Sequence, residues 1–122
     1  MKRYVGRRDA QGRLRVNVET LSEGREATRF ASYALPPRLD LFNHSPDGFE
    51  IGYSGSGPAQ LSLAILADHL GDDELAVRLH QEFKRHTIAT YDRDFGFNIT
   101  SEEVAGIIRA ISEPHDPGSG DR

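Results

Sequence analysis

Residues 48–66 read GFEIGYSGSGPAQLSLAIL: a short β-type run, a glycine-rich turn and then a long apolar run. Pro58 suits the first position of a helix, where its missing N–H is not needed. The apolar residues continue to Ala67 with few polar interruptions, and a helix that is apolar on nearly all sides is a buried one. We therefore predict a central helix over 58–70 that packs on a sheet.

Capping residues predict two further helices. Gly71 suits the left-handed residue that ends a helix, and Asp72 can cap the next one. The second helix carries its predicted inward-facing stripe at Leu75, Ala76, Leu79, Phe83 and Thr87. Thr100 and Glu103 form a capping box that opens the third helix, whose apolar stripe is Val104, Ile107, Ile108 and Ile111.

The N-terminal residues predict an antiparallel hairpin. Aliphatic residues alternate with polar ones over 14–18, a short run at 4–5 provides the partner strand, and DAQG at 9–12 provides the turn. The polar stretch 20–29 is expected to be a loop.

The turn SPDG at 45–48 predicts a second hairpin. It has the residues of a type I turn and lies between the short runs LDLF (39–42) and FEIGY (49–53). FGFNI at 95–99 predicts one more strand. The expected fold is α+β, with a small, mostly antiparallel sheet of about three to five strands and two hairpins, packed on about three helices.

Length and composition indicate one domain over 1–112, followed by a disordered tail over 113–122 that contains no hydrophobic residue. The chain has no cysteine, which excludes disulfides, thiol catalysis and zinc–thiolate sites. No apolar segment reaches the roughly 18 residues that span a bilayer. We expect a soluble, cytoplasmic protein with no membrane partner.

Charge is distributed unevenly along the chain. The net charge is −4, yet residues 1–15 hold six Lys or Arg against Asp9 alone. Arg3, Arg13 and Arg15 are candidate anion contacts. The alternative is that these arginines solvate an exposed sheet edge. We do not expect binding to a specific duplex nucleic acid.

The glycine-rich turn is the strongest candidate for a ligand site. A strand, a glycine-rich turn and a helix N-terminus together present free N–H groups to an anion such as a phosphate. The candidate binding residues are Ser54, Gly55, Ser56, Gly57 and Gln60. The turn lacks the lysine of a P-loop, and Pro58 removes one donor. The alternative is that the glycines only allow the helix to pack tightly on the sheet.

Asn43 and His44 are two further candidate ligand contacts. The segment 43–47, NHSPD, contains serine, histidine and aspartate, but a catalytic triad is defined by geometry and not by adjacency. We predict no catalytic residue, although an enzyme that uses His44 stays open. His80 and His86 lie six residues apart, which does not suit two ligands on one helical face, so we predict no metal and no cofactor.

The block 43–84, NHSPDGFEIGYSGSGPAQLSLAILADHLGDDELAVRLHQEFK, resembles an uncharacterised family of small bacterial and phage proteins. Its members carry a motif close to NHSPxGFxxGYxGSGPAQLALAIL, followed by a helix that ends in Phe-Lys, here Phe83 and Lys84. The start YVGRR at 4–8 is also similar, whereas Ile51 stands where the family has an aromatic residue. The resemblance implies no activity. It implies a setting of phages and mobile elements, whose small genes often modulate host defence or replication.

These observations favour a non-catalytic binding module for a phosphate-bearing ligand such as a nucleotide. The alternative is a protein–protein interaction module without a small ligand, which would use an exposed sheet edge or helix face. The sequence leaves the oligomeric state open.

Overall fold

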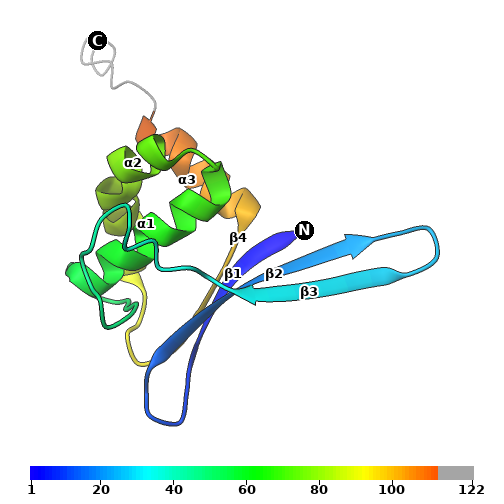
Figure 1. Ribbon diagram of the computed structural model, residues 1–122, viewed down its shortest axis with the longest axis horizontal. Coiled ribbons are helices and arrows are strands. Elements are labelled where there is room, and N and C mark those ends of the chain that lie inside the picture. The colour runs from blue at the N-terminus through cyan, green and yellow to red at the C-terminus, as the bar shows by residue number, and fades with distance from the viewer. Residues whose placement is uncertain (113–122) are drawn as a thin grey trace.

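Four antiparallel strands form one sheet in the order β3-β2-β1-β4 (Figure 1). The computed structural model describes residues 1–112. Its elements are β1 (Lys2–Arg8), β2 (Leu14–Glu23), β3 (Thr28–Ala34), α1 (Ser56–Leu70), α2 (Asp73–His86), the 3-10 helix η1 (Ile88–Thr90), β4 (Phe97–Thr100) and α3 (Ser101–Ser112). The predicted α+β class, with an antiparallel sheet and three helices, is confirmed.

The helices cover one face of the sheet. Directly paired residues share a face, so Tyr4 and its partner Ile99 lie together. The Tyr4 hydroxyl donates to Asp68 of α1 at 2.7 Å, which identifies this face as the helix side. Arg3 and its partner Glu19 are the next residues along β1 and β2 from the pair Tyr4 and Val18, so their side chains lie on the opposite, helix-free face.

Helix α1 is the central packing element, as predicted. Every residue from 57 to 67 is buried, and the helix begins at Ser56, two residues before the predicted start. Gly71 ends the helix with a φ of 64°, and the Asp72 carboxylate accepts a hydrogen bond from the Leu75 N–H at 3.1 Å. These contacts confirm the predicted stop and cap. Two residues link α1 to α2, and the two helices pack against each other.

The predicted β4 strand and third helix are also confirmed. The Thr100 N–H donates to the Glu103 carboxylate at 2.9 Å, and the Glu103 N–H donates to the Thr100 hydroxyl at 3.1 Å. This reciprocal pair satisfies two donors that the helix start would otherwise leave free. On α2, the predicted stripe is buried or half-buried, but the same side also carries buried His80 and Lys84.

Asp68 joins the sheet to α1. Its carboxylate accepts hydrogen bonds from the hydroxyls of Tyr4 and Tyr33 at 2.7 and 2.6 Å, and pairs with the Lys2 ammonium at 2.7 Å. Burial alone raises the pKa of Asp68, but these three donors outweigh it and lower the pKa below its ordinary value. Two strands, β1 and β3, are thus fixed to one helix through a single carboxylate.

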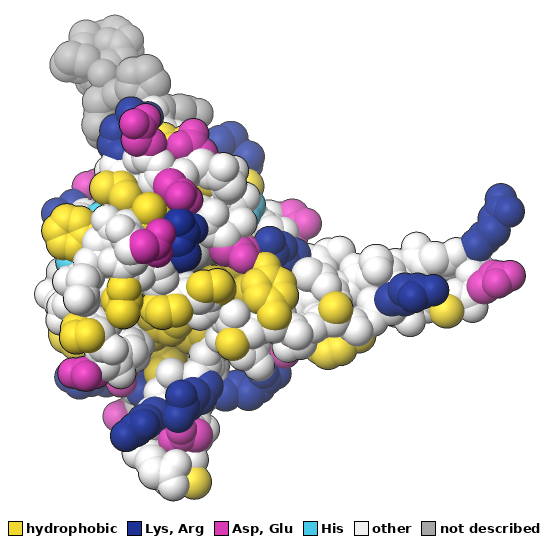
Figure 2. Space-filling model, in the orientation of Figure 1, with side chains coloured by type: hydrophobic (Ala, Val, Ile, Leu, Met, Phe, Trp, Pro, Cys, Tyr) yellow, Lys and Arg dark blue, Asp and Glu magenta, His cyan; other side chains and the backbone are white. Residues whose placement is uncertain are grey.

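Strands β2 and β3 continue past the end of β1 as a two-stranded arm (Figures 1 and 2). The last β1–β2 pair is Lys2 with Thr20, whereas β2–β3 pairing continues to Glu23 with Thr28. The predicted loop over 20–29 is therefore wrong. Both faces of the arm are open to solvent, so its residues show none of the apolar alternation by which a half-buried strand is recognised.

The predicted second hairpin over 39–53 is also wrong, because no strand forms between 35 and 55. The turn at Pro46 and Asp47 is present, but the flanking runs are held by side chains and not by a strand ladder. Arg38 binds the carboxylates of Asp40 and Asp73, which fixes the start of this segment to α2. The second hairpin of the sheet is instead formed by β2 and β3.

None of the helices within residues 1–112 is long and apolar enough to cross a membrane. The tail predicted at 113–122 lies outside the described residues.

Candidate functional site

The glycine-rich turn leads directly into α1. Gly55 is the residue before the helix and has extended backbone, and no side chain caps this end. Within residues 1–112, the N–H groups of Ser56 and Gly57 have no acceptor. The side chains of Ser54 and Ser56 are exposed. The start of α1 therefore has two backbone donors without an acceptor, at exposed Ser56 and buried Gly57, beside two accessible hydroxyls.

One side of this helix start is already covered by Glu50. A Cβ built at Gly57 would lie 2.7 Å from the Glu50 Cβ, so only glycine permits the contact. The Glu50 carboxylate binds the Arg8 guanidinium with two bonds of 2.9 Å, and Arg8 also donates to the Arg93 carbonyl. Gly57 therefore has a packing role, and the acidic side chain next to it is neutralised by Arg8.

Gln60 is fully buried and connects three backbone groups. Its carbonyl accepts hydrogen bonds from the N–H groups of His44 and Ser45 at 2.7 and 3.1 Å, and its amide donates to the Pro37 carbonyl at 2.7 Å. These bonds hold the segment that carries Asn43 and His44 against α1. Asn43 itself is exposed.

His44 and His80 form a hydrogen-bonded pair, with 2.9 Å between their Nε2 atoms. His80 Nδ1 lies 2.6 Å from the Val77 carbonyl, which can only accept. Neutral His80 therefore carries its proton on Nδ1 and accepts at Nε2, so His44 is the Nε2 donor and its Nδ1 keeps a free lone pair. Phe42 stacks on the His44 ring at 4.1 Å and fixes its plane.

Lys84 lies one helical turn after His80 on the same side of α2. The residue is only 8% exposed, and it forms no hydrogen bond or ion pair with any residue of the described chain. Burial lowers the pKa of both imidazoles, and the nearby Lys84 charge lowers them further. No carboxylate is among the groups that shift these pKa values. The cluster is therefore basic and has no counter-charge from the described residues.

The cluster is connected to α1 through Gln60. The segment before α1 also meets the segment after α2. The Gly52 N–H, just before α1, donates to the Ile88 carbonyl, just after α2, at 3.0 Å. Gln60 in turn connects α1 to the backbone of His44. Gln60 is thus the link between α1 and the histidine–lysine cluster, and no contact within residues 1–112 joins Lys84 to the N–H groups of Ser56 and Gly57.

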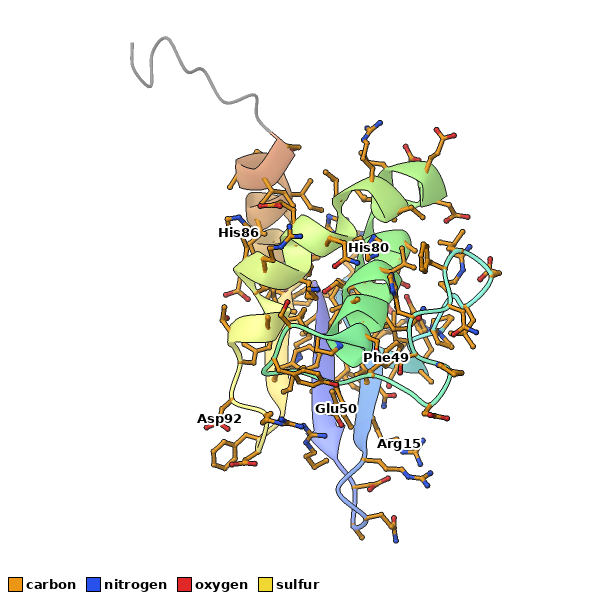
Figure 3. All side chains as sticks on the ribbon, turned by 90° about the vertical axis from the view of Figure 1, so that its left-hand side faces the viewer. Arg15, Phe49, Glu50, His80, His86 and Asp92 are labelled. Atoms are coloured by element: carbon orange, nitrogen blue, oxygen red, sulfur yellow. The ribbon has the colours of Figure 1, made fainter. Side chains whose placement is uncertain are left out.

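The structure does not bring the three candidate arginines together. Arg3 lies on the helix-free face of the sheet, where it pairs with Glu19 at 3.0 Å. Arg15 pairs with Asp9, also at 3.0 Å. Arg13 and Arg15 line a shallow hollow with residues 47–50, which precede the glycine-rich turn. Figure 3 shows Arg15 and Glu50 at the lower end of the molecule, well below His80.

The comparison with family models gives one match over residues 4–110, described as "Family of unknown function (DUF6166)". The chain belongs to this family. The matched range contains the whole sheet from Tyr4 onward, the glycine-rich turn and the histidine–lysine cluster. The comparisons with curated proteins and with solved structures gave no match.

In this DUF6166 domain, His80 and Lys84 lie beside His44, although neither was a candidate ligand contact from the sequence. His80 and Lys84 are four residues apart on α2. They are polar residues on the buried side of the helix that Ala76 and Phe83 also occupy. That spacing is the signal that could have found them, because polar residues on an inward-facing stripe need partners. His86 lies on a different face of α2 from His80. It is exposed, and its Nε2 atom lies 3.5 Å from the Glu82 carboxylate. Within residues 1–112, no group of three His, Asp or Glu side chains could hold a metal.

Proposed function

We propose that the protein is a non-catalytic binding module for a phosphate-bearing anion, such as a nucleotide. The proposed site comprises the start of α1 with Ser54 and Ser56, the His44 side chain and Lys84. The observation that carries the proposal is the largely buried Lys84 side chain, which has no hydrogen-bond or ion-pair partner in the described chain.

A lysine held at a largely buried position without a counter-charge is less favourable than a paired one, because burial removes part of its hydration. A bound phosphate would provide that counter-charge. The phosphate would also accept hydrogen bonds from the N–H groups of Ser56 and Gly57, where the helix dipole favours negative charge. A protonated His44 Nδ1 would add a donor. Gln60 is not a ligand in this proposal, since three protein groups already use its amide.

The biological setting remains part of the proposal. The resemblance of the 43–84 block to small phage and bacterial proteins supports a cytoplasmic role on a phage or mobile element. A nucleotide-type ligand is available in that compartment.

The test compares thermal unfolding of the wild type and Lys84→Met in sodium phosphate, AMP and ATP at constant ionic strength. For the wild type, we expect stabilisation that grows with ligand, reaching about 2.7 kcal/mol at a hundred-fold excess over Kd. Lys84→Met should lose this response, yet be more stable than the wild type without ligand by about 1 kcal/mol, because an unpaired buried charge is gone.

Arg78→Met is the matched control. Arg78 is exposed on the same helix and has no ion pair within the described residues, so the substitution removes the same charge from the surface. It should leave both the stability and the ligand response nearly unchanged. A wild type that responds to none of the three anions would overturn the proposal. So would an equal response in Lys84→Met.

A protein–protein interaction module is the second candidate function. The observation that favours it is strand β3, which is exposed along its whole length at the edge of the sheet.

A further inference from the structure

We propose that the outer edge of β3 pairs with the same edge of a second copy of this chain. The pairing is antiparallel and centred on Ala31, so that two four-stranded sheets become one continuous sheet. This inference does not depend on the anion site, since Ala31 lies on β3 and Lys84 on α2.

Strand β3 lacks the features that usually protect an edge strand. All seven residues, Thr28–Ala34, are exposed, and they include no proline and one charge, Arg29. Phe30 and Tyr33 are 63% and 43% exposed. Natural edge strands are usually short, charged or bulged, because their unpaired backbone groups invite another strand. The opposite edge, β4, has only four residues and continues directly into α3.

The backbone groups of β3 alternate between β2 and solvent. The Leu35 N–H donates to the Val16 carbonyl at 3.0 Å, which makes this a hydrogen-bonded pair. Such pairs recur at every second residue, so the odd-numbered residues of β3 bond to β2. The even-numbered residues, Thr28, Phe30, Ser32 and Ala34, therefore point their N–H and C=O groups outward. Within the described residues these N–H groups have no acceptor.

One register satisfies all of these outward groups at once. With the two-fold axis at Ala31, Phe30 pairs with Ser32 of the second copy, and Thr28 pairs with Ala34 of the second copy. Each pair occurs twice and exchanges two bonds, which gives about eight hydrogen bonds. A centre at Phe30 or Ser32 leaves one end of the strand unpaired, so the strand is self-complementary in this register alone.

The side chains suit the same register. Ala31 meets its own copy at the axis, where the residues of a non-hydrogen-bonded pair approach most closely and a small side chain fits. Arg29 faces Tyr33 of the second copy, so the single charge does not face itself. Pairing would also support the arm, because a two-stranded ribbon on its own is marginally stable in water.

The first test is sedimentation velocity of the full chain over a range of concentrations. We expect the wild type to reach twice its monomer mass of 13.6 kDa. Ala31→Lys and Ala31→Glu should each stay monomeric, because like charges would meet at the axis. A one-to-one mixture of the two variants should regain the dimer. Ala31 is exposed, so both variants should keep the wild-type circular dichroism spectrum.

The second test uses the absence of cysteine. Ala31→Cys should form a disulfide-linked dimer under mild oxidation, since paired Cα atoms about 4.5 Å apart lie within disulfide range. Gln11→Cys, in the exposed turn between β1 and β2, is the control and should not cross-link. A wild type that is monomeric at every concentration would refute the inference. A mixture of the Lys and Glu variants that stays monomeric would also refute it.

Discussion

Replacing Gln60 by methionine should destabilise the fold even though the side chain keeps nearly the same length. Gln60 is fully buried, and its amide connects Pro37, His44 and Ser45. Methionine fills the same space but offers neither a donor nor a comparable acceptor. The substitution therefore separates hydrogen bonding from packing.

The expected loss follows from the three bonds. A typical intramolecular hydrogen bond contributes about 1 kcal/mol net, so three bonds give an upper figure of about 3 kcal/mol. The three partners are only partly buried, and water can replace some of the lost contacts. We expect a decrease of about 2 kcal/mol in the free energy of unfolding, or roughly 8 °C in Tm for a domain of this size.

Urea unfolding and amide hydrogen exchange measure this effect. The exchange of the His44 and Ser45 amides should accelerate in Gln60→Met, because both N–H groups lose their acceptor. Gln81→Met is the control, since Gln81 is more exposed and has no hydrogen-bond partner within residues 1–112. A loss in Gln60→Met as small as in the control would refute the structural role and leave the Gln60 amide free for a ligand.

Two further predictions concern pH. The pKa values of His44 and His80 lie below the ordinary value of 6.5 because of burial first and nearby positive charge second. In this pH range the unfolded chain therefore binds more protons than the folded protein. The free energy of unfolding should fall as pH decreases from about 7.5 to 5.5, by at most about 2.7 kcal/mol per pH unit for two protons. Urea titrations should show a flatter profile when both are replaced by Asn. Asp68, whose pKa lies below its ordinary value of 3.8, contributes stability above that value that is lost as pH falls through the lower folded value. Acid unfolding followed by circular dichroism should show a smaller acid-side loss in Asp68→Asn, and an unchanged profile would contradict the carboxylate tether.

Local signals predicted most of the helical part of the fold. The left-handed residue at Gly71, the cap at Asp72 and the box formed by Thr100 and Glu103 are interactions between near neighbours in the sequence. Such interactions depend little on the rest of the chain, so residue types alone reveal them. The apolar run of α1, with few polar interruptions, likewise indicated burial on all sides.

The segment 35–55 could not be predicted in the same way. Its conformation depends on contacts with residues far along the chain, such as Gln60 with Pro37 and Arg38 with Asp73. Hydrogen bonds made by the side chains of Arg38 and Gln60 take the place of the backbone ladder that a hairpin would provide. Short β-type runs beside a good turn therefore predicted a hairpin that the tertiary contacts do not form.

The candidate site was located only in part for a related reason. The glycine-rich turn and His44 were visible as sequence motifs, but the partner of His44 lies 36 residues away on α2. Lys84 stands on a stripe that otherwise predicts core packing. Its significance comes from a missing partner, and the absence of a contact becomes visible only when all neighbours have been placed.

Substitutions of Gln60 and Lys84 should change the stability of the ligand-free protein in opposite directions, although both should weaken phosphate binding. Gln60 positions His44, so Gln60→Met should weaken the response to phosphate while also lowering stability. Lys84→Met removes a charge that the empty fold does not balance, so it should abolish the response while raising stability. Two residues on neighbouring helices would then have opposite effects on the empty protein and the same effect on binding. A purely structural cluster would not produce this combination, because both substitutions would then leave the response to added phosphate unaltered.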